Sequence, residues 1–158
     1  MPYLVRHAHA GDKRNWTGPD LERPLSETGR REAHGLLTRL RDYDITRILS
    51  SPAVRCLQTV EPVAARRGLT LETIAVLGVG GEPAGLLELL LDPGAGEFLV
   101  CSHGELIGRV LCQLIGRELQ ADSWPKGSTW VLEVVRGQLR DSRYLPPLRL
   151  QDTDAGYY

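Results

Sequence analysis

Three polar residues follow the first apolar stretch of the chain. Leu4 and Val5 are apolar, and Arg6, His7 and His9 come directly after them. A guanidinium beside an imidazole suits a phosphoryl group, because the planar fork of arginine matches two of its oxygens at once. The His-x-His spacing is also a pattern of metal ligands. This motif alone leaves a phosphate pocket, a metal site and a plain surface loop open.

Two further polar motifs follow apolar runs later in the chain. Arg55 lies about one helical turn after the run Ile45–Leu49, and His103 follows the run Phe98–Cys101. In an α/β protein, ligands bind beyond the carboxyl ends of the parallel strands. We therefore expect both histidines and both arginines of these motifs to face one rim of the sheet.

The two guanidiniums suggest how His7 would react. Positive charges nearby disfavour the protonated imidazole and lower its pKa, so that a neutral nucleophile persists at neutral pH. His7 is predicted to attack phosphorus and form a phosphohistidine, which water then discharges. Arg6, Arg55 and His103 would stabilise the charge on the transferring group.

Strand-like and helical patterns alternate along the chain, and this order predicts the fold. Such an order is typical of a mostly parallel sheet with helices on both faces, here a three-layer α/β/α sandwich. Ser51 is expected to cap a helix that Pro62 kinks or restarts. The predicted strands are 3–5, 45–49, 69–76, 98–101, 130–135 and 138–144, and the predicted helices begin near residues 26, 52, 84 and 105.

The composition is that of an ordinary globular domain. The chain has 158 residues, 42% of them hydrophobic, which is enough for one domain with a buried core. Its net charge of -1 provides no basic field for nucleic acid, and no apolar run is long enough to cross a bilayer. Three cysteines without CxxC spacing and an N-terminus without a signal pattern favour free thiols in the cytoplasm. We expect one domain over residues 1–145 and a polar tail over 146–158.

Four motifs together resemble the histidine phosphatases of the phosphoglycerate-mutase-like superfamily. They are LVRHAHAG (4–11), RPLSETGRREA (23–33), SSPAVRCLQT (50–59) and VCSHGELIG (100–108). The short chain is similar to the small SixA-type phosphohistidine phosphatases. The stretch WPKGSTWVLEV (124–134) is also similar to the phosphatase-like half of two-domain Nudix hydrolases. The resemblance implies Arg6, His7, Arg55 and His103 as the catalytic set, no cofactor, and a phosphorylated small molecule or phosphoprotein as substrate.

A proton donor for the leaving group is harder to find in the sequence. Larger members of the family place a carboxylic acid in a loop before the fourth strand, and Glu82 is the candidate by position. A glutamate in the first turn of a helix is also an ordinary surface residue that matches the helix dipole. Without an acid, only a good leaving group would depart, such as that of a phosphohistidine, acyl phosphate or pyrophosphate. Further substrate contacts are predicted for His9, Lys13, Arg23 and Lys126.

Other functions remain open at this point. A metal-dependent amidohydrolase would need a longer chain and more ligands than four histidines supply. A non-catalytic phosphate- or nucleotide-binding module, a mutase, and a nucleotide or sugar phosphatase fit the same residues. Hydrolysis is favoured over phosphoryl return, because the short chain leaves little lid to exclude water. The sequence predicts no metal, no nucleic-acid or membrane partner, and no particular oligomeric state.

Overall fold

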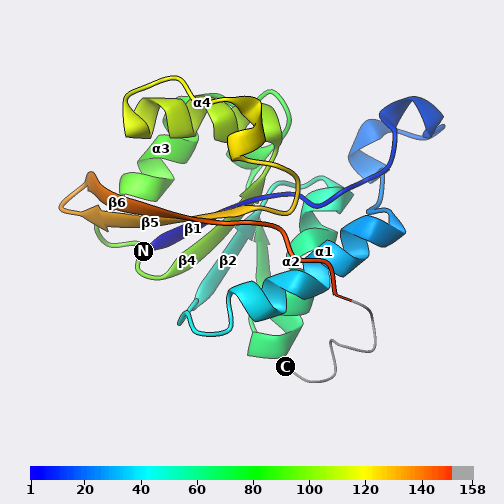
Figure 1. Ribbon diagram of the computed structural model, residues 1–158, viewed down its shortest axis with the longest axis horizontal. Coiled ribbons are helices and arrows are strands. Elements are labelled where there is room, and N and C mark those ends of the chain that lie inside the picture. Colours follow the sequence, from blue (N-terminus) through cyan, green and yellow to red (C-terminus); the bar gives the residue numbers. More distant parts are fainter. Residues whose placement is uncertain (151–158) are drawn as a thin grey trace.

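A six-stranded mixed sheet forms the centre of the protein (Figure 1). The structure is a computed structural model, and it describes residues 1–150. The strand order is β3-β2-β4-β1-β5-β6. The strands are β1 (Pro2–Arg6), β2 (Arg47–Ser50), β3 (Leu71–Thr73), β4 (Phe98–Ser102), β5 (Thr129–Val135) and β6 (Gln138–Leu145). The first four are parallel to one another, and the β5–β6 hairpin joins antiparallel beside β1.

Two pairs of helices cover the two faces of this sheet (Figure 1). They are α1 (Glu27–Arg39) with α2 (Val54–Arg67), and α3 (Pro83–Leu91) with α4 (Gly104–Ile115). Successive residues of a strand point to opposite faces, and β1 shows this alternation. Tyr3 and Val5 pack in the cluster of α1 and α2, whereas Leu4 packs in the cluster of α3 and α4. The predicted three-layer sandwich with a mostly parallel sheet is confirmed.

The predicted third strand is shorter than expected. Of residues 69–76, only Leu71–Thr73 pair with β2. The chain then turns through a 3₁₀ helix (Ala75–Leu77), which buries Leu77 completely in the cluster of α3 and α4. The pairing stops at Thr73 because its partner, Ser50, is the last residue of β2.

The second helix also differs from the prediction. Its N-cap is Ala53 rather than Ser51. The Ser51 hydroxyl accepts the Ala53 N–H at 3.2 Å and also contacts His103 at 2.8 Å. The helix does not restart at Pro62, because it runs without a break from Val54 to Arg67. Proline costs a helix one hydrogen bond, but the buried stripe of this helix packs against the core on both sides of it. Gly68 ends the helix, in the left-handed conformation at φ +65°.

Close backbone packing places α1 against the segment that follows β1. A Cβ atom at Gly29 would overlap the carbonyl oxygen of His9. On the same helix, a Cβ at Gly35 would overlap the carbonyl of Leu148, and the Leu150 N–H donates to the Arg31 carbonyl at 3.1 Å. Residues 146–150 of the predicted tail thus lie along α1, and the rest of that tail lies outside the described residues.

No helix in residues 1–150 is long and apolar enough to cross a membrane.

Candidate active site

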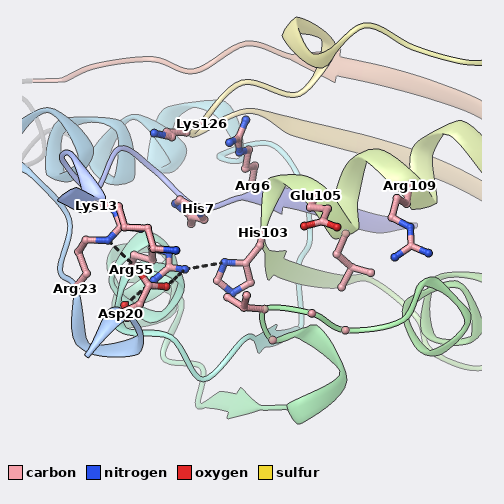
Figure 2. A pocket seen from close by; sticks show the side chains of 15 residues that line it. Arg6, His7, Lys13, Asp20, Arg23, Arg55, His103, Glu105, Arg109 and Lys126 are labelled. Atoms are coloured by element: carbon pink, nitrogen blue, oxygen red, sulfur yellow. Dashed lines mark hydrogen bonds and ion pairs between the residues drawn. The ribbon is translucent and has the colours of Figure 1, made fainter. Parts of the chain in front are cut away.

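The carboxyl ends of β1 and β4 lie side by side and begin the site. Arg6 is in register with Ser102, and the His7 N–H donates to the Ser102 carbonyl at 3.1 Å. The rings of His7 and His103 meet edge to face, with centroids 5.5 Å apart. Figure 2 shows these two rings with the guanidiniums of Arg6 and Arg55 around one cavity of about 320 Å³. The structure therefore brings both predicted imidazoles and both predicted guanidiniums to one cavity.

A single hydrogen bond determines which ring nitrogen of His7 keeps a free lone pair. Its Nδ1 lies 2.8 Å from the Ala8 carbonyl oxygen, which can only accept a hydrogen bond. Nδ1 must therefore carry the proton, and Nε2 keeps its lone pair. Because the side chain is only 6% exposed, loss of water is the main cause that lowers the pKa of His7 to about 3. Repulsion by His103, Arg55 and Arg6 adds to this effect, so the guanidiniums expected to dominate are a smaller cause.

His103 is held from both of its ring nitrogens. Nε2 lies 2.8 Å from the Ser51 hydroxyl, and Nδ1 lies 3.4 Å from Nη2 of Arg55. A guanidinium only donates, so Nδ1 accepts here and Nε2 carries the proton that is donated to Ser51. This pairing turns the Nδ1 edge of the ring toward Arg55.

Asp20 lines the cavity, and the sequence analysis did not single it out. It lies in a 3₁₀ turn (Asp20–Glu22) between the first two motifs, and its carboxylate bridges two arginines. Oδ2 is 3.1 Å from Nη2 of Arg55, and Oδ1 is 3.3 Å from Nε of Arg23. Partial burial raises the pKa of Asp20, but the charge of Arg55 and the hydrogen bond from Arg23 outweigh it, and the net pKa is lowered. One aspartate in a polar loop carries no spacing signal that would have revealed this role.

Arg6 is fitted against the start of α4. Its Nη1 donates to the Trp124 carbonyl at 3.0 Å, and burial lowers its pKa. A Cβ at Gly104 would lie 2.6 Å from Cζ of Arg6, so only glycine leaves room for the guanidinium. The buried Nε atoms of Arg6 and Arg55 have no hydrogen-bond partner within the described residues. Such donors cost free energy when left unsatisfied, and the oxygens of an anion would satisfy them.

Two of the predicted substrate-binding residues lie at the pocket without an ion pair. Lys13 and Lys126 both line the cavity, and no ion pair to either is found within residues 1–150. The N–H of Gly127 donates to the carbonyls of Arg6 and His7 at 3.1 and 3.2 Å, which fixes Lys126 beside the site. Burial lowers the pKa of Lys126, and the nearby arginines lower it further.

The other predicted residues are engaged elsewhere. Arg23 lines the pocket but donates to Asp20 and to the Ala10 carbonyl. His9 is not among the lining residues, and its Nδ1 lies 2.6 Å from the Ser26 hydroxyl. Glu82 is not among them either: its side chain is 81% exposed, with Oε2 4.0 Å from Nη2 of Arg109. Two charged residues line the cavity although the sequence analysis did not single them out, namely Glu105 and Arg109.

The comparisons with known proteins agree with this geometry. The model of the histidine phosphatase superfamily (branch 1) matches residues 2–78, which include the first three motifs. The part of the chain that carries these motifs is thus similar to this superfamily. The solved structure of the SixA protein from Agrobacterium tumefaciens has a similar fold. It is 28% identical with a TM-score of 0.73, and the match covers 92% of this chain and 97% of that one. The protein histidine phosphatase SixA complexed with tungstate matches with 21% identity and a TM-score of 0.71, over 94% of this chain and 96% of that one.

One relative of the superfamily is a much longer protein. The 8-oxo-(d)GTP phosphatase of Mycolicibacterium smegmatis is 30% identical over 154 residues, which are 91% of this chain and 47% of the relative. The chain thus spans about half the length of this relative.

In residues 1–150, no three His, Cys, Asp or Glu side chains gather in a cluster that could hold a metal ion.

Replacement of Gly104 by alanine should displace the guanidinium of Arg6 while the fold is kept, since the added Cβ meets the end of a flexible side chain. A displacement of about 1 Å is expected to weaken phosphoryl transfer by roughly 10²-fold. The measurement is kcat/KM on an aryl phosphate together with the melting temperature. Gln113→Ala on the exposed side of the same helix is the control, and an active Gly104→Ala variant would contradict the steric role.

The low pKa of His7 should make the protein lose stability in acid. The unfolded chain binds a proton on this imidazole near its ordinary pKa of 6.5, whereas the folded chain resists protonation down to about pH 3. Stability due to neutral His7 is therefore complete above pH 6.5 and is lost as the pH falls toward 3, by roughly 1 kcal/mol per pH unit. Urea unfolding of the wild type and of His7→Asn between pH 7 and 4 measures this difference. Parallel curves would show that His7 has no depressed pKa.

Proposed function

We propose that the protein is a phosphatase that works through a phosphohistidine at His7. The observation that carries this proposal is the hydrogen bond from Nδ1 of His7 to Ala8, which leaves Nε2 with a lone pair. The pocket surrounds this nitrogen with the guanidiniums of Arg6 and Arg55 and the ring of His103. The superfamily match and the phosphatase names of its relatives support the same reaction.

The proposed reaction has two displacements at phosphorus. In the first, the lone pair of His7 Nε2 forms the N–P bond, and the bond from phosphorus to the leaving group breaks with its electron pair. In the second, a water oxygen attacks phosphorus, the N–P bond returns its electrons to Nε2, and inorganic phosphate departs. Arg6 and Arg55 bind the non-bridging oxygens in both steps, and their preorganised donors lower the barrier. The proposal needs no metal ion.

The leaving group is proposed to be one that departs without much help. Glu82 is the predicted acid, but its carboxylate lies outside the pocket lining and beside Arg109. A proton donor must come within hydrogen-bond reach of the departing atom. The leaving group of a phosphohistidine or a phosphoanhydride departs without such a donor. The SixA relatives favour a phosphohistidine protein as the substrate.

A nucleoside di- or triphosphate is the second candidate substrate, and the two lysines favour it. Lys13 and Lys126 line the same cavity as the catalytic set, where ammonium groups would bind a second phosphate. The relative named 8-oxo-(d)GTP phosphatase points the same way. A non-catalytic phosphate-binding module would keep these contacts but would form no covalent intermediate.

Rapid mixing with a ³²P-labelled aryl phosphate or phosphohistidine peptide should trap label on His7 that is stable in base and labile in acid. His7→Asn should take up no label and lose at least ~10³-fold in kcat, because the covalent route is gone. Vanadate or tungstate should inhibit, and a chelator should have no effect. His34→Gln is the control for replacing a histidine outside the pocket. Acid-stable label, or turnover by His7→Asn, would refute the assignment.

Activity should depend steeply on the leaving group if no acid assists. The kcat/KM for an activated aryl phosphate, a phosphohistidine peptide and a nucleoside diphosphate should exceed that for an alkyl phosphate by ~10²-fold or more, which is what an acid typically contributes. Glu82→Gln should then leave all four values unchanged. A selective loss on the alkyl phosphate in that variant would establish Glu82 as the acid.

A selective loss on the diphosphate in Lys126→Ala would favour the nucleotide substrate.

A further inference from the structure

Asp20 lies between Arg23 and Arg55, two arginines of the pocket that come from different motifs. Arg55, on α2, donates Nη2 to the Asp20 carboxylate at 3.1 Å and Nη1 to the Asp20 carbonyl at 2.9 Å. Arg23 donates Nε to the other carboxylate oxygen at 3.3 Å and Nη1 to the Ala10 carbonyl at 2.8 Å. The side chains of Arg55 and Arg23 are 5% and 11% exposed, and all three residues line the pocket. Figure 2 shows the carboxylate directly against Arg55, on the side away from His7.

These contacts hold the plane of the Arg55 guanidinium. Asp20 takes one N–H from each terminal nitrogen, so the guanidinium plane cannot turn about the Cδ–Nε bond without losing both hydrogen bonds. The Nε of Arg55 remains buried without a partner within the described residues, and Nη2 also faces Nδ1 of His103 at 3.4 Å. Nη2 donates to Asp20 and faces His103, so the Nε–H and the second N–H of Nη1 are the donors that remain for a phosphoryl group beside His103.

We propose that Asp20 is a positioning residue for phosphoryl transfer, which holds Arg55 in the orientation that binds the transferring group. The proposal rests on the phosphatase function proposed above. The carboxylate itself brings a negative charge near an anionic substrate and repels it. Asp20 therefore contributes through the orientation of Arg55, and its effect belongs in kcat more than in KM.

An acid role for Asp20 does not fit the same contacts. Arg55 and Arg23 together lower the pKa of this carboxyl, so it holds no proton to donate at neutral pH. Arg23 in turn connects Asp20 to the Ala10 carbonyl, three residues after His7 in the chain. The loop that carries Asp20 is thus tied to the segment that carries the nucleophile, and it has a fixed position relative to it.

A double-mutant cycle tests this role. Asp20→Asn, Arg55→Lys and the double variant are compared with the wild type on an aryl phosphate, with kcat and KM measured separately. Asp20→Asn is expected to lower kcat by ~10- to 100-fold, the usual effect of losing a group that orients a functional side chain. KM should stay the same or fall. In the Arg55→Lys background, the same substitution should cost less than about threefold, because Asp20 acts only through Arg55.

Asp12→Asn is the matched control. Asp12 lies in the same loop and pairs with the exposed Arg14, and it does not line this pocket. The Asp12→Asn variant should leave kcat unchanged, and the melting temperatures of Asp12→Asn and Asp20→Asn should match. Equal effects of Asp20→Asn and Asp12→Asn, a full loss that persists beside Arg55→Lys, or an Asp20→Asn enzyme faster than wild type would each overturn the proposal. An inactive wild type would instead refute the phosphatase function, and the positioning role with it.

Discussion

The hydrogen bond from Nδ1 of His7 to the Ala8 carbonyl is the contact on which the site depends. It fixes the tautomer of a buried imidazole, and burial in turn keeps the ring neutral. A protonated ring would have no lone pair at Nε2, and the other tautomer would present a hydrogen there. Because the acceptor is the backbone of the next residue, the reactive tautomer follows from the path of the chain as it leaves β1. Parallel pairing with β4 then sets His103 beside this ring.

The crowding of positive charge sets the second constraint. Arg6, Arg23 and Arg55 line one small cavity, and each gives at least one N–H to a backbone carbonyl. These carbonyls stabilise the guanidiniums without neutralising them, so the cavity keeps its attraction for an anion. Within the described residues, Asp20 is the one carboxylate that pairs with any of these three arginines, and it pairs with Arg23 and Arg55, the two that come from outside β1. The repulsion among the cations is therefore relieved on the side of the cavity away from His7.

Sequence reasoning predicted the layers well, because burial imposes simple periods on strands and helices. The run Phe98–Cys101 has no polar residue, and it is the strand buried on both faces at the centre of the sheet. The prediction was wrong where one tertiary contact outweighs a local preference. Ser51 was expected to be the helix cap, yet the helix begins two residues later than that and the Ser51 hydroxyl bridges the Ala53 N–H and the ring of His103. Pro62 has the identity of a helix breaker, yet packing on both sides of it keeps α2 continuous.

For the site, the sequence could indicate which groups end at the rim but not which of them bond to one another. Arg6, His7 and His103 follow strands directly, and the rule for parallel sheets places them. Asp20 and Arg23 lie in a polar loop, where spacing carries no such information, and their positions follow from long-range contacts with Arg55 and Ala10. The sequence alone also does not show what the glycines of the motifs leave room for. Gly104 makes room for a guanidinium, so a residue with no side chain decides where a charged side chain can bind an anion.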